Sequence, residues 1–141
     1  MNVKGLMLAM MSLLVLSLSF AQNKILGFAL MNAELVIDGL CITSFLRKED
    51  MERFGVTSKD LDGIVAQLRN TSGVEVAVFM YELETGVYKV SLRASNYADV
   101  SKVAQMFGGG GHVKAAGCSM NGTPEEIMAK LTEQLELQLR R

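Results

Sequence analysis

The segment FGGGGHVKAAG, residues 107–117, places four consecutive glycines directly before the only histidine of the chain. Glycine loses more conformational entropy on folding than any other residue, so four in a row need a structural or functional reason. A flexible linker is disfavoured, because ordered patterns flank the segment closely and a linker would not need a histidine. A Walker loop would end in Gly-Lys-Ser/Thr, whereas here Lys114 precedes Ala115. No frame fits Gly-x-Gly-x-x-Gly either, so the sequence predicts a loop without side chains whose amides contact a ligand.

His112 and Lys114 indicate what kind of ligand this loop would bind. Amides that are free of Cβ crowding form a concave site for an anion. In such a site His112 would donate a hydrogen bond to a phosphate or stack on a base, and Lys114 would add positive charge. The competing interpretation of His112 is a core or helix-capping residue. The adjacent glycines and the nearby Arg93 favour the binding role.

Arg93 lies in KVSLRAS, residues 89–95, which has the alternating pattern of a strand. The polar residues would share one face of this strand and the apolar residues the other: Lys89, Ser91, Arg93 and Ser95 against Val90, Leu92 and Ala94. Arginine offers bidentate geometry to a phosphate, so the polar face is a candidate phosphate-binding strip. An ordinary solvent-exposed face is the alternative.

Composition restricts the class of partner. Half of the 141 residues are apolar, which excludes a disordered chain, and the formal net charge of −1 provides no overall field that would attract nucleic acid. An anion site must therefore be local. One basic patch exists between residues 89 and 114, where Asp99 is the single acid. Its four cationic residues are Lys89, Arg93, Lys102 and Lys114.

The two cysteines and the single histidine form no recognisable zinc or iron–sulfur pattern. Cys41 and Cys118 each lie in an apolar, strand-like run, where a free thiol behaves as a small hydrophobic side chain. We expect both to be reduced core residues and predict no metal ligand and no catalytic residue in the chain.

Periodicity and turn signals predict an α/β domain with a mixed β-sheet flanked by helices. Helices are expected at residues 22–34, 47–55, 57–72, 97–107 and 124–139, with hairpins at Asp38-Gly39 and Glu84-Thr85-Gly86 and a buried strand at 115–122. Thr57 or Ser58 would cap the third of these helices. Thr123-Pro124-Glu125-Glu126 has the pattern of a capping box with proline at the first helical position. The helix that follows carries one apolar stripe: Ile127, Leu131, Leu135 and Leu139.

Residues 1–21 form a separate apolar segment, and residues 22–141 form the predicted domain. Lys4 precedes an uncharged run from Gly5 to Phe20, and Ala21 would suit a cleavage site, as in a secretory signal peptide. The run is shorter than the ~20 residues that a membrane span needs. The alternatives are an apolar N-terminal helix of the domain and the artefact of a truncated reading frame.

The segments YKVSLRAS and FGGGGHVKAAGCSMNGTPEE resemble the DHH-associated C-terminal domain of the DHH phosphoesterases, of the bacterial nanoRNase and 3′-phosphoadenosine 5′-phosphate phosphatase type. The resemblance extends through GVEVAVFMYE, FGVTSKDLDGIVAQLRN and SFAQNKILGFAL, and so covers roughly residues 19–137. It implies that Gly109, Gly110, Gly111 and His112 form a substrate-binding loop. Arg93, with Ser95 beside it, would correspond to the strand that contacts the substrate.

In that family a separate DHH domain binds Mn²⁺ through Asp and His residues, and the metals generate the hydroxide that attacks the phosphate. This chain departs from the pattern, since it contains no Asp-His-His and its one histidine lies in the glycine segment. The resemblance therefore implies a substrate-binding half that is inactive by itself. Its ligand would be a short oligoribonucleotide or 3′-phosphoadenosine 5′-phosphate, and its partner a separate DHH domain that holds the Mn²⁺; a homodimer is a further expectation.

The sequence is also compatible with two other functions. The chain would be a stand-alone RNA- or nucleotide-binding regulatory module without hydrolytic activity, or it would belong with the related C-terminal region of alanyl-tRNA synthetases. The resemblance implies a cytoplasmic location, with export or membrane attachment through residues 1–21 as the alternative.

Overall fold

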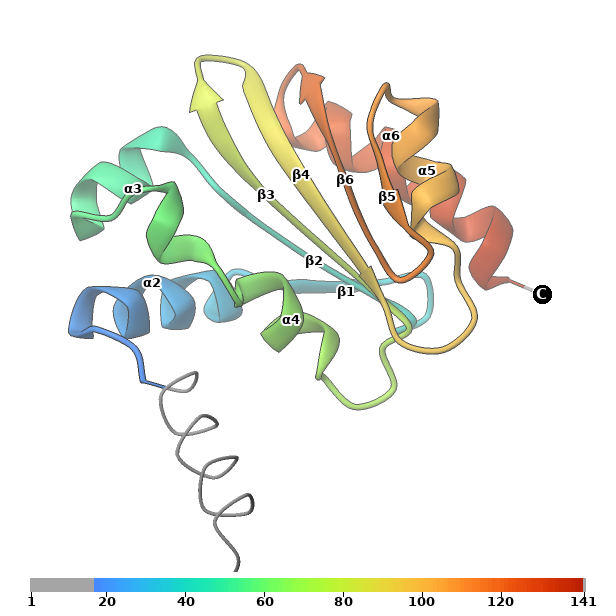
Figure 1. Ribbon diagram of the computed structural model, residues 1–141, viewed down its shortest axis with the longest axis horizontal. Coiled ribbons are helices and arrows are strands. Elements are labelled where there is room, and N and C mark those ends of the chain that lie inside the picture. The colour runs from blue at the N-terminus through green and yellow to red at the C-terminus, as the bar shows by residue number, and fades with distance from the viewer. Residues whose placement is uncertain (1–16, 141) are drawn as a thin grey trace, which may run out of the picture.

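The computed structural model describes residues 17–140 of the chain and shows an α/β domain built on a six-stranded sheet (Figure 1). The elements follow in the order α2 (Phe20–Met31), β1 (Glu34–Val36), β2 (Cys41–Leu46), α3 (Lys48–Phe54), the 3₁₀ helix η1 (Ser58–Leu61), α4 (Ile64–Arg69), β3 (Val76–Glu84), β4 (Val87–Ala94), α5 (Val100–Met106), β5 (Gly110–His112), β6 (Ala115–Asn121) and α6 (Pro124–Leu139). Among these residues, no helix combines the length and the apolar character needed to cross a membrane.

The sheet is mixed, as predicted. Its strand order is β1-β2-β3-β4-β6-β5, in which β2 and β3 are parallel and every other neighbouring pair is antiparallel. The parallel pair needs a long crossover connection, and α3, η1 and α4 provide it. The two predicted hairpins are confirmed, since β1 pairs with β2 and β3 pairs with β4 around the expected turns.

Helices cover the two faces of the sheet unequally (Figure 1). One face packs on α5 and α6, and its core includes the predicted stripe of α6, Ile127, Leu131, Leu135 and Leu139. The other face packs on α2, η1 and α4, whose apolar residues cover strand residues from β2 and β3 only, such as Ile42 and Phe79. Within residues 17–140, β6 and β5 contribute nothing to the buried core of that second face.

Hydrogen bonds at helix termini explain where several helices begin. The Thr123 hydroxyl accepts from the Glu126 amide at 3.1 Å, and Pro124 occupies the first turn, so the predicted capping box is confirmed. Gly55 ends α3 in the left-handed conformation with φ 65°, as its position after a polar helix predicted.

Cys41 and Cys118 are free and buried, and burial raises the pKa of the Cys41 thiol to about 12.

Three predicted boundaries differ from the structure. The helix expected over residues 57–72 is broken into η1 and α4, because Gly63 adopts a left-handed conformation with φ 90° between them. The helix expected over residues 22–34 spans Phe20–Met31 instead, since the Ser19 hydroxyl caps it. The boundary at residue 22 thus falls inside α2, whereas residues 1–16, most of the apolar segment, lie outside the described residues.

Candidate functional site

The glycine segment is not a loop throughout, because three of its residues form the edge strand β5. Gly110 pairs with Gly117, Gly111 with Ala116 and His112 with Ala115, which makes β5 and β6 an antiparallel hairpin. The turn of the hairpin is held by backbone hydrogen bonds. The Val100 amide donates to the Val113 carbonyl at 2.8 Å, and the Ala94 amide donates to the Lys114 carbonyl at 2.9 Å.

The glycines of this segment differ in what requires them. A Cβ atom at Gly109 would lie 2.1 Å from the Gly117 carbonyl oxygen, and one at Gly111 would lie 2.6 Å from the Ala115 carbonyl oxygen. Close packing against β6 therefore accounts for Gly109 and Gly111 without any ligand. A Cβ atom at Gly110 would meet no atom within 4 Å, so this position borders open space.

Three neighbouring strands align the predicted site residues in rows. Arg93 of β4 pairs with Ala115 of β6, which pairs with His112 of β5. Directly paired residues in antiparallel strands project from the same face of a sheet, so Arg93 and His112 flank the small side chain of Ala115. A second row on this face consists of Ser91, Gly117 and Gly110. Together with Lys89 and Ser119 of the third row, these two rows make up what we call the open face.

The open face borders a hollow of about 120 Å³ where β4 approaches η1 and α4. Lys89, Ser91 and Arg93 line one side of it, and Ser58, Asp62 and Gly63 contribute to the other. The break between η1 and α4 at Gly63 thus borders the predicted phosphate-binding strip. The core residues Leu61 and Phe79 also line the hollow.

The charged and polar side chains at the centre of the open face are available for a ligand. Within residues 17–140, the Arg93 guanidinium forms no ion pair, and its hydrogen bond goes to the neighbouring Leu92 carbonyl at 3.2 Å. His112 is exposed, and its imidazole forms no hydrogen bond or ion pair within the same part of the chain. A guanidinium and an imidazole separated by an alanine can contact an anionic group that rests on the backbone between them.

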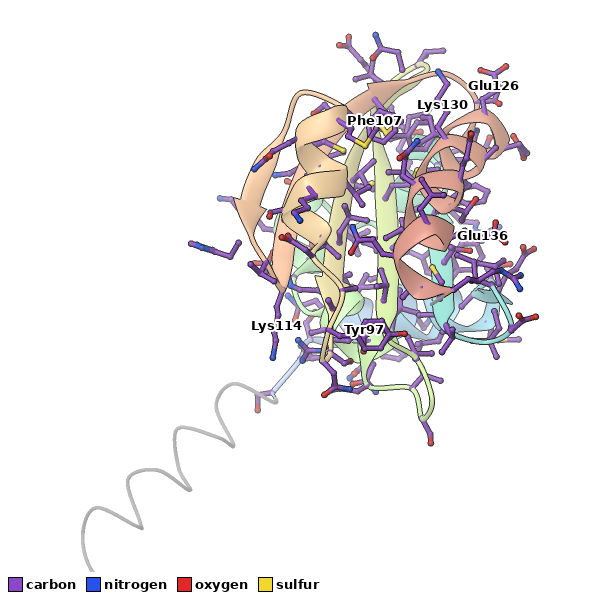
Figure 2. The ribbon with its side chains drawn as sticks, turned by 90° about the vertical axis from the view of Figure 1, so that its right-hand side faces the viewer. Tyr97, Phe107, Lys114, Glu126, Lys130 and Glu136 are labelled. Atoms are coloured by element: carbon purple, nitrogen blue, oxygen red, sulfur yellow. The ribbon has the colours of Figure 1, made fainter. Side chains whose placement is uncertain are left out.

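Two predicted site residues lie at the margin of this arrangement. The Ser95 hydroxyl donates to the Val74 carbonyl at 3.4 Å, and its amide donates to the Glu75 carbonyl at 2.8 Å, so Ser95 is engaged with the β2–β3 connection. Lys114 is exposed in the β5–β6 turn and extends away from the sheet (Figure 2). The structure therefore brings Arg93, Gly110 and His112 together and leaves Ser95 and Lys114 outside this group.

Glu75 holds the segment that follows Arg93, and the sequence analysis did not identify it. The residue is 3% exposed, and its carboxylate accepts hydrogen bonds from the amides of Asn96, Tyr97 and Ala98 at 2.8 to 3.1 Å. Desolvation by burial raises the pKa of Glu75, but the hydrogen bonds from Ala98, Asn96 and Tyr97 outweigh it, and the pKa lies below its usual value. The signal in the sequence was a single acid inside an apolar strand run, GVEVAVF.

Glu75 acts on the site through the segment that joins β4 to α5. This segment follows Arg93 and leads to Asp99, whose carboxylate caps α5 by accepting from the Ser101 amide at 3.0 Å. The hydrogen bond from the Ser101 hydroxyl is the main cause that lowers the pKa of Asp99. Because the first residue of α5, Val100, holds the β5–β6 turn, the carboxylate of Glu75 helps to fix Arg93 and His112 relative to each other.

The family resemblance implies a metal centre in a separate DHH domain and no metal ligand in this chain. Between residues 17 and 140, no three His, Cys, Asp or Glu side chains are grouped so that they could hold a metal ion. The groups that the open face offers are a guanidinium, an imidazole, hydroxyls and backbone next to glycine and alanine. Groups of these kinds are chemically able to bind and orient an anion.

Comparisons with known proteins agree with the resemblance. A family model described as the DHHA1 domain matches residues 38–140. Two relatives carry the name bifunctional oligoribonuclease and PAP phosphatase NrnA: the Thermus thermophilus protein is 30% identical over 117 residues, and the Bacillus subtilis protein is 32% identical over 110 residues. The matches cover 79% and 77% of this chain but 34% of each relative, so the chain spans about a third of the length of these curated relatives.

Among solved structures, an exopolyphosphatase-related protein from Bacteroides fragilis is similar to this chain with a TM-score of 0.80 at 26% identity. The match covers 89% of this chain and 38% of that one. The similarity therefore includes nearly the whole fold described above. As with the curated relatives, it covers only one part of the other protein.

Proposed function

Because this chain belongs to the DHHA1 domain family, we propose that it binds short oligoribonucleotides or 3′-phosphoadenosine 5′-phosphate on the open face of its sheet. Two relatives at 30% and 32% identity are named for activity on these two classes of substrate. Their names also favour this function over the relationship to alanyl-tRNA synthetases. A cytoplasmic location is part of the proposal, because such nucleotides are intracellular compounds; export is the alternative.

The observation that carries the proposal is the row formed by Arg93, Ala115 and His112. Arg93 would form a charge-assisted, bidentate contact with a phosphate, and His112 would donate to a second oxygen or stack on a base. Ala115 and the Gly110–Gly117 pair would let the ligand approach the backbone. A sheet surface with small central residues and a hollow at its border would suit a nucleotide, whose phosphate and base need separate contacts.

We propose further that hydrolysis requires a DHH domain outside the described residues. Such a domain would supply Mn²⁺ and the attacking hydroxide. The contribution of this chain would be to hold the nucleotide, neutralise phosphate charge through Arg93 and orient the scissile bond. The alternative is a regulatory module that binds the same ligands without any hydrolysis.

Metal-free calorimetry on the full chain tests the binding step with 3′-phosphoadenosine 5′-phosphate and a two- to five-nucleotide RNA as ligands. We expect Arg93→Ala and His112→Ala each to weaken binding by about 1–3 kcal/mol, the scale of a lost charged hydrogen bond. Gly110→Val would abolish binding, because its side chain would occupy the open face. Lys130→Ala, on the helix that covers the opposite face, is the matched control for loss of a positive charge (Figure 2).

The outcomes separate the hypotheses. Equal affinity of the parent and all three open-face variants would refute the proposed site. Binding that the variants lose, followed by metal-dependent cleavage when a DHH domain of the same family is added, would support the role as the substrate-binding half. Binding without cleavage under those conditions would support the regulatory module.

A further inference from the structure

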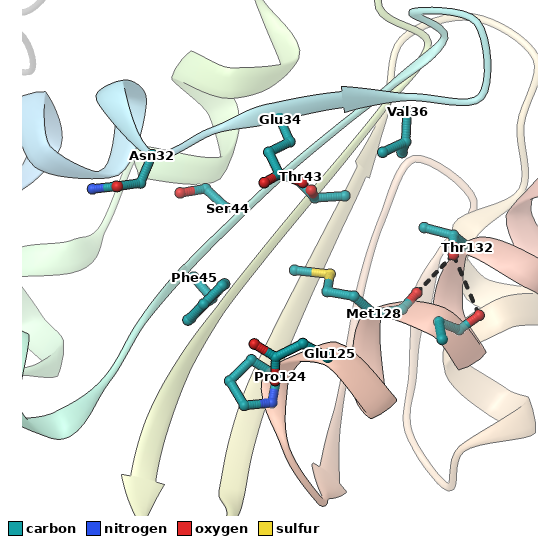
Figure 3. Close-up of a pocket in the computed structure, with 11 residues that line it drawn as sticks. Asn32, Glu34, Val36, Thr43, Ser44, Phe45, Pro124, Glu125, Met128 and Thr132 are labelled. Atoms are coloured by element: carbon teal, nitrogen blue, oxygen red, sulfur yellow. Dashed lines mark hydrogen bonds between the residues drawn. The ribbon is translucent and has the colours of Figure 1, made fainter.

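Two cavities outside the hollow beside Arg93 differ in what they offer a ligand. The larger, of about 290 Å³, lies between the β1–β2 hairpin and α6, on the face of the sheet that packs on α5 and α6 (Figure 3). Its charged residues, Glu34 and Glu125, are two exposed acids. Among residues 17–140, the Tyr88 hydroxyl is the single buried side-chain oxygen or nitrogen without a hydrogen-bond partner, and Tyr88 does not line this cavity. This cavity is therefore assigned no ligand.

The other cavity, which we call the second hollow, has a volume of about 270 Å³ and lies where α3 approaches the end of β3. Its apolar residues are Met51, Val56 and Leu83, and Leu83 is 46% exposed although its side chain is large and apolar. Apolar walls with a few polar groups are typical of small-molecule sites. The second hollow therefore offers apolar surface to a ligand.

Glu82 joins the walls of the second hollow. Its carboxylate accepts from the Lys48 amide at 3.0 Å, at the start of α3, and from the Gly86 amide at 3.2 Å, in the β3–β4 turn. The hydrogen bond from the Lys48 amide is the main cause that lowers the pKa of Glu82. Because one side chain joins α3 to the β3–β4 hairpin, the walls of the second hollow are held together without a ligand.

Tyr81 lies between the second hollow and the hollow beside Arg93. It lines both of them, as does Ser58 of η1. Tyr81 of β3 pairs directly with Lys89 of β4, so both residues project from the open face. The Tyr81 side chain is partly exposed, and its ring stacks on no other aromatic ring among the described residues. An aromatic ring beside a cation is a surface on which a nucleic-acid base can stack.

Lys89 extends the proposed phosphate-binding strip toward Tyr81. Lys89 and Arg93 are four residues apart on one strand, which places their Cα atoms ~13 Å apart. Within residues 17–140, neither of them forms an ion pair. One phosphate group cannot contact both cations at once, whereas a strand of several nucleotides can follow the row between them.

The charges of the second hollow favour a base over a further phosphate. Lys48 lines it together with two acids, Glu52 and Glu82, so the lining carries no net positive charge. A phosphate would be repelled by the two carboxylates. A neutral, flat base matches the apolar walls and the aromatic ring.

We propose that the second hollow is a nucleobase subsite, in which one base of an oligoribonucleotide stacks on Tyr81 while Lys89 contacts the neighbouring phosphate. The inference rests on the proposed function, because the same strand would place another phosphate at Arg93. It makes Tyr81 a residue that distinguishes an oligoribonucleotide from 3′-phosphoadenosine 5′-phosphate, whose single base would remain near His112.

Metal-free calorimetry on the full chain tests this subsite with the RNA trinucleotide of adenosine, triadenylate, and with 3′-phosphoadenosine 5′-phosphate as probes. Tyr81→Ala should weaken triadenylate binding about tenfold through the lost stacking, and should change the affinity for the mononucleotide by less than about twofold. Tyr81→Phe keeps the ring and should bind both probes like the parent. Lys89→Gln should weaken triadenylate binding about threefold and make it less dependent on salt.

Triadenylate analogues that each lack one base test the same contact from the side of the ligand. For one of the three analogues, Tyr81→Ala should have no further effect, because the base that stacks on Tyr81 is already missing. The other two should remain sensitive to this substitution. Phe20→Ala removes an exposed ring outside both hollows and is the matched control, which should leave all affinities unchanged.

Arg93→Ala distinguishes failure of this subsite from failure of the proposed function. If the parent binds neither probe, or if Arg93→Ala leaves both affinities unchanged, both inferences are overturned. If Arg93→Ala weakens both probes but Tyr81→Ala weakens neither, or weakens both equally, the nucleobase subsite alone is overturned. Urea denaturation checks that Tyr81→Ala is folded, and Tyr81→Leu, which keeps apolar packing, gives the same test if it is not.

Discussion

Strand β4 belongs to two very different surfaces, depending on which of its alternate side chains is considered. Tyr88, Val90 and Leu92 are buried under α5 and α6, where the sheet is fully covered. Lys89 and the partly exposed Ser91 and Arg93 project from the other face, which continues over Gly117 and Gly110, and no helix of the described part of the chain packs on it there. One strand therefore contributes to folding through its covered face and to the proposed binding through its open face.

The two faces of the sheet differ in the size of the side chains that β6 contributes to them. On the covered side, β6 contributes Ala116, Cys118 and Met120 to the core. On the open side it contributes Ala115, Gly117 and Ser119, which are small enough to leave the backbone accessible. Small residues at these positions cost stability, and the folding of the hairpin then depends on close packing between β5 and β6.

The largest expected effect is on the free energy of unfolding, and it should differ between Gly109, which packs against β6, and Gly110, which borders open space. Gly109→Ala should destabilise the protein by about 3 kcal/mol, because the new Cβ atom would clash with the Gly117 carbonyl and force β5 away from β6. Gly110→Ala should change the free energy of unfolding by less than about 1 kcal/mol, since its Cβ atom meets nothing within 4 Å. Urea denaturation of both variants measures the difference. Equal destabilisation would mean that the open face is not open at Gly110.

A smaller effect is expected at Glu75, whose carboxylate binds the amides of the segment that follows β4. Glu75→Gln should destabilise the protein by about 2 kcal/mol, because a neutral amide replaces a buried carboxylate that accepts from three backbone amides. The pKa of Glu75 is lowered in the folded protein. Its stabilising contribution is therefore complete above the pKa of the unfolded chain and is lost as the pH falls through the folded-state value.

Urea denaturation as a function of pH checks this prediction, with Glu84→Gln as the control because Glu84 is an exposed acid at the end of β3. The parent should lose stability on acidification more steeply than Glu75→Gln, and the two curves should converge at low pH. Parallel curves would show that Glu75 does not hold the segment through its charge.

The sequence predicted most of the covered face and only part of the open one. Period-2 alternation in β4 and the apolar stripe of α6 report burial directly, so the sheet and its helices followed from them. The β5 strand was missed because four glycines carry no alternating pattern, and the pairing with β6 that orders them is a tertiary contact. The role of Glu75 was missed for the same reason, since its partners lie more than twenty residues away along the chain.

The smallest expected effect concerns Tyr88, which places a polar hydroxyl in the apolar core of the covered face. Its hydroxyl is buried without a hydrogen-bond partner among the described residues, and burial raises the pKa of this group. Tyr88→Phe should therefore stabilise the protein by about 1 kcal/mol, because it removes a desolvated polar atom and leaves the ring packing intact. Tyr81→Phe is the matched control, since Tyr81 lies partly exposed on the opposite face of β3 and should show no change. If Tyr88→Phe instead lowered the free energy of unfolding in urea, the Tyr88 hydroxyl would have a partner such as a buried water. The covered face would then be stabilised by a polar contact as well as by apolar packing.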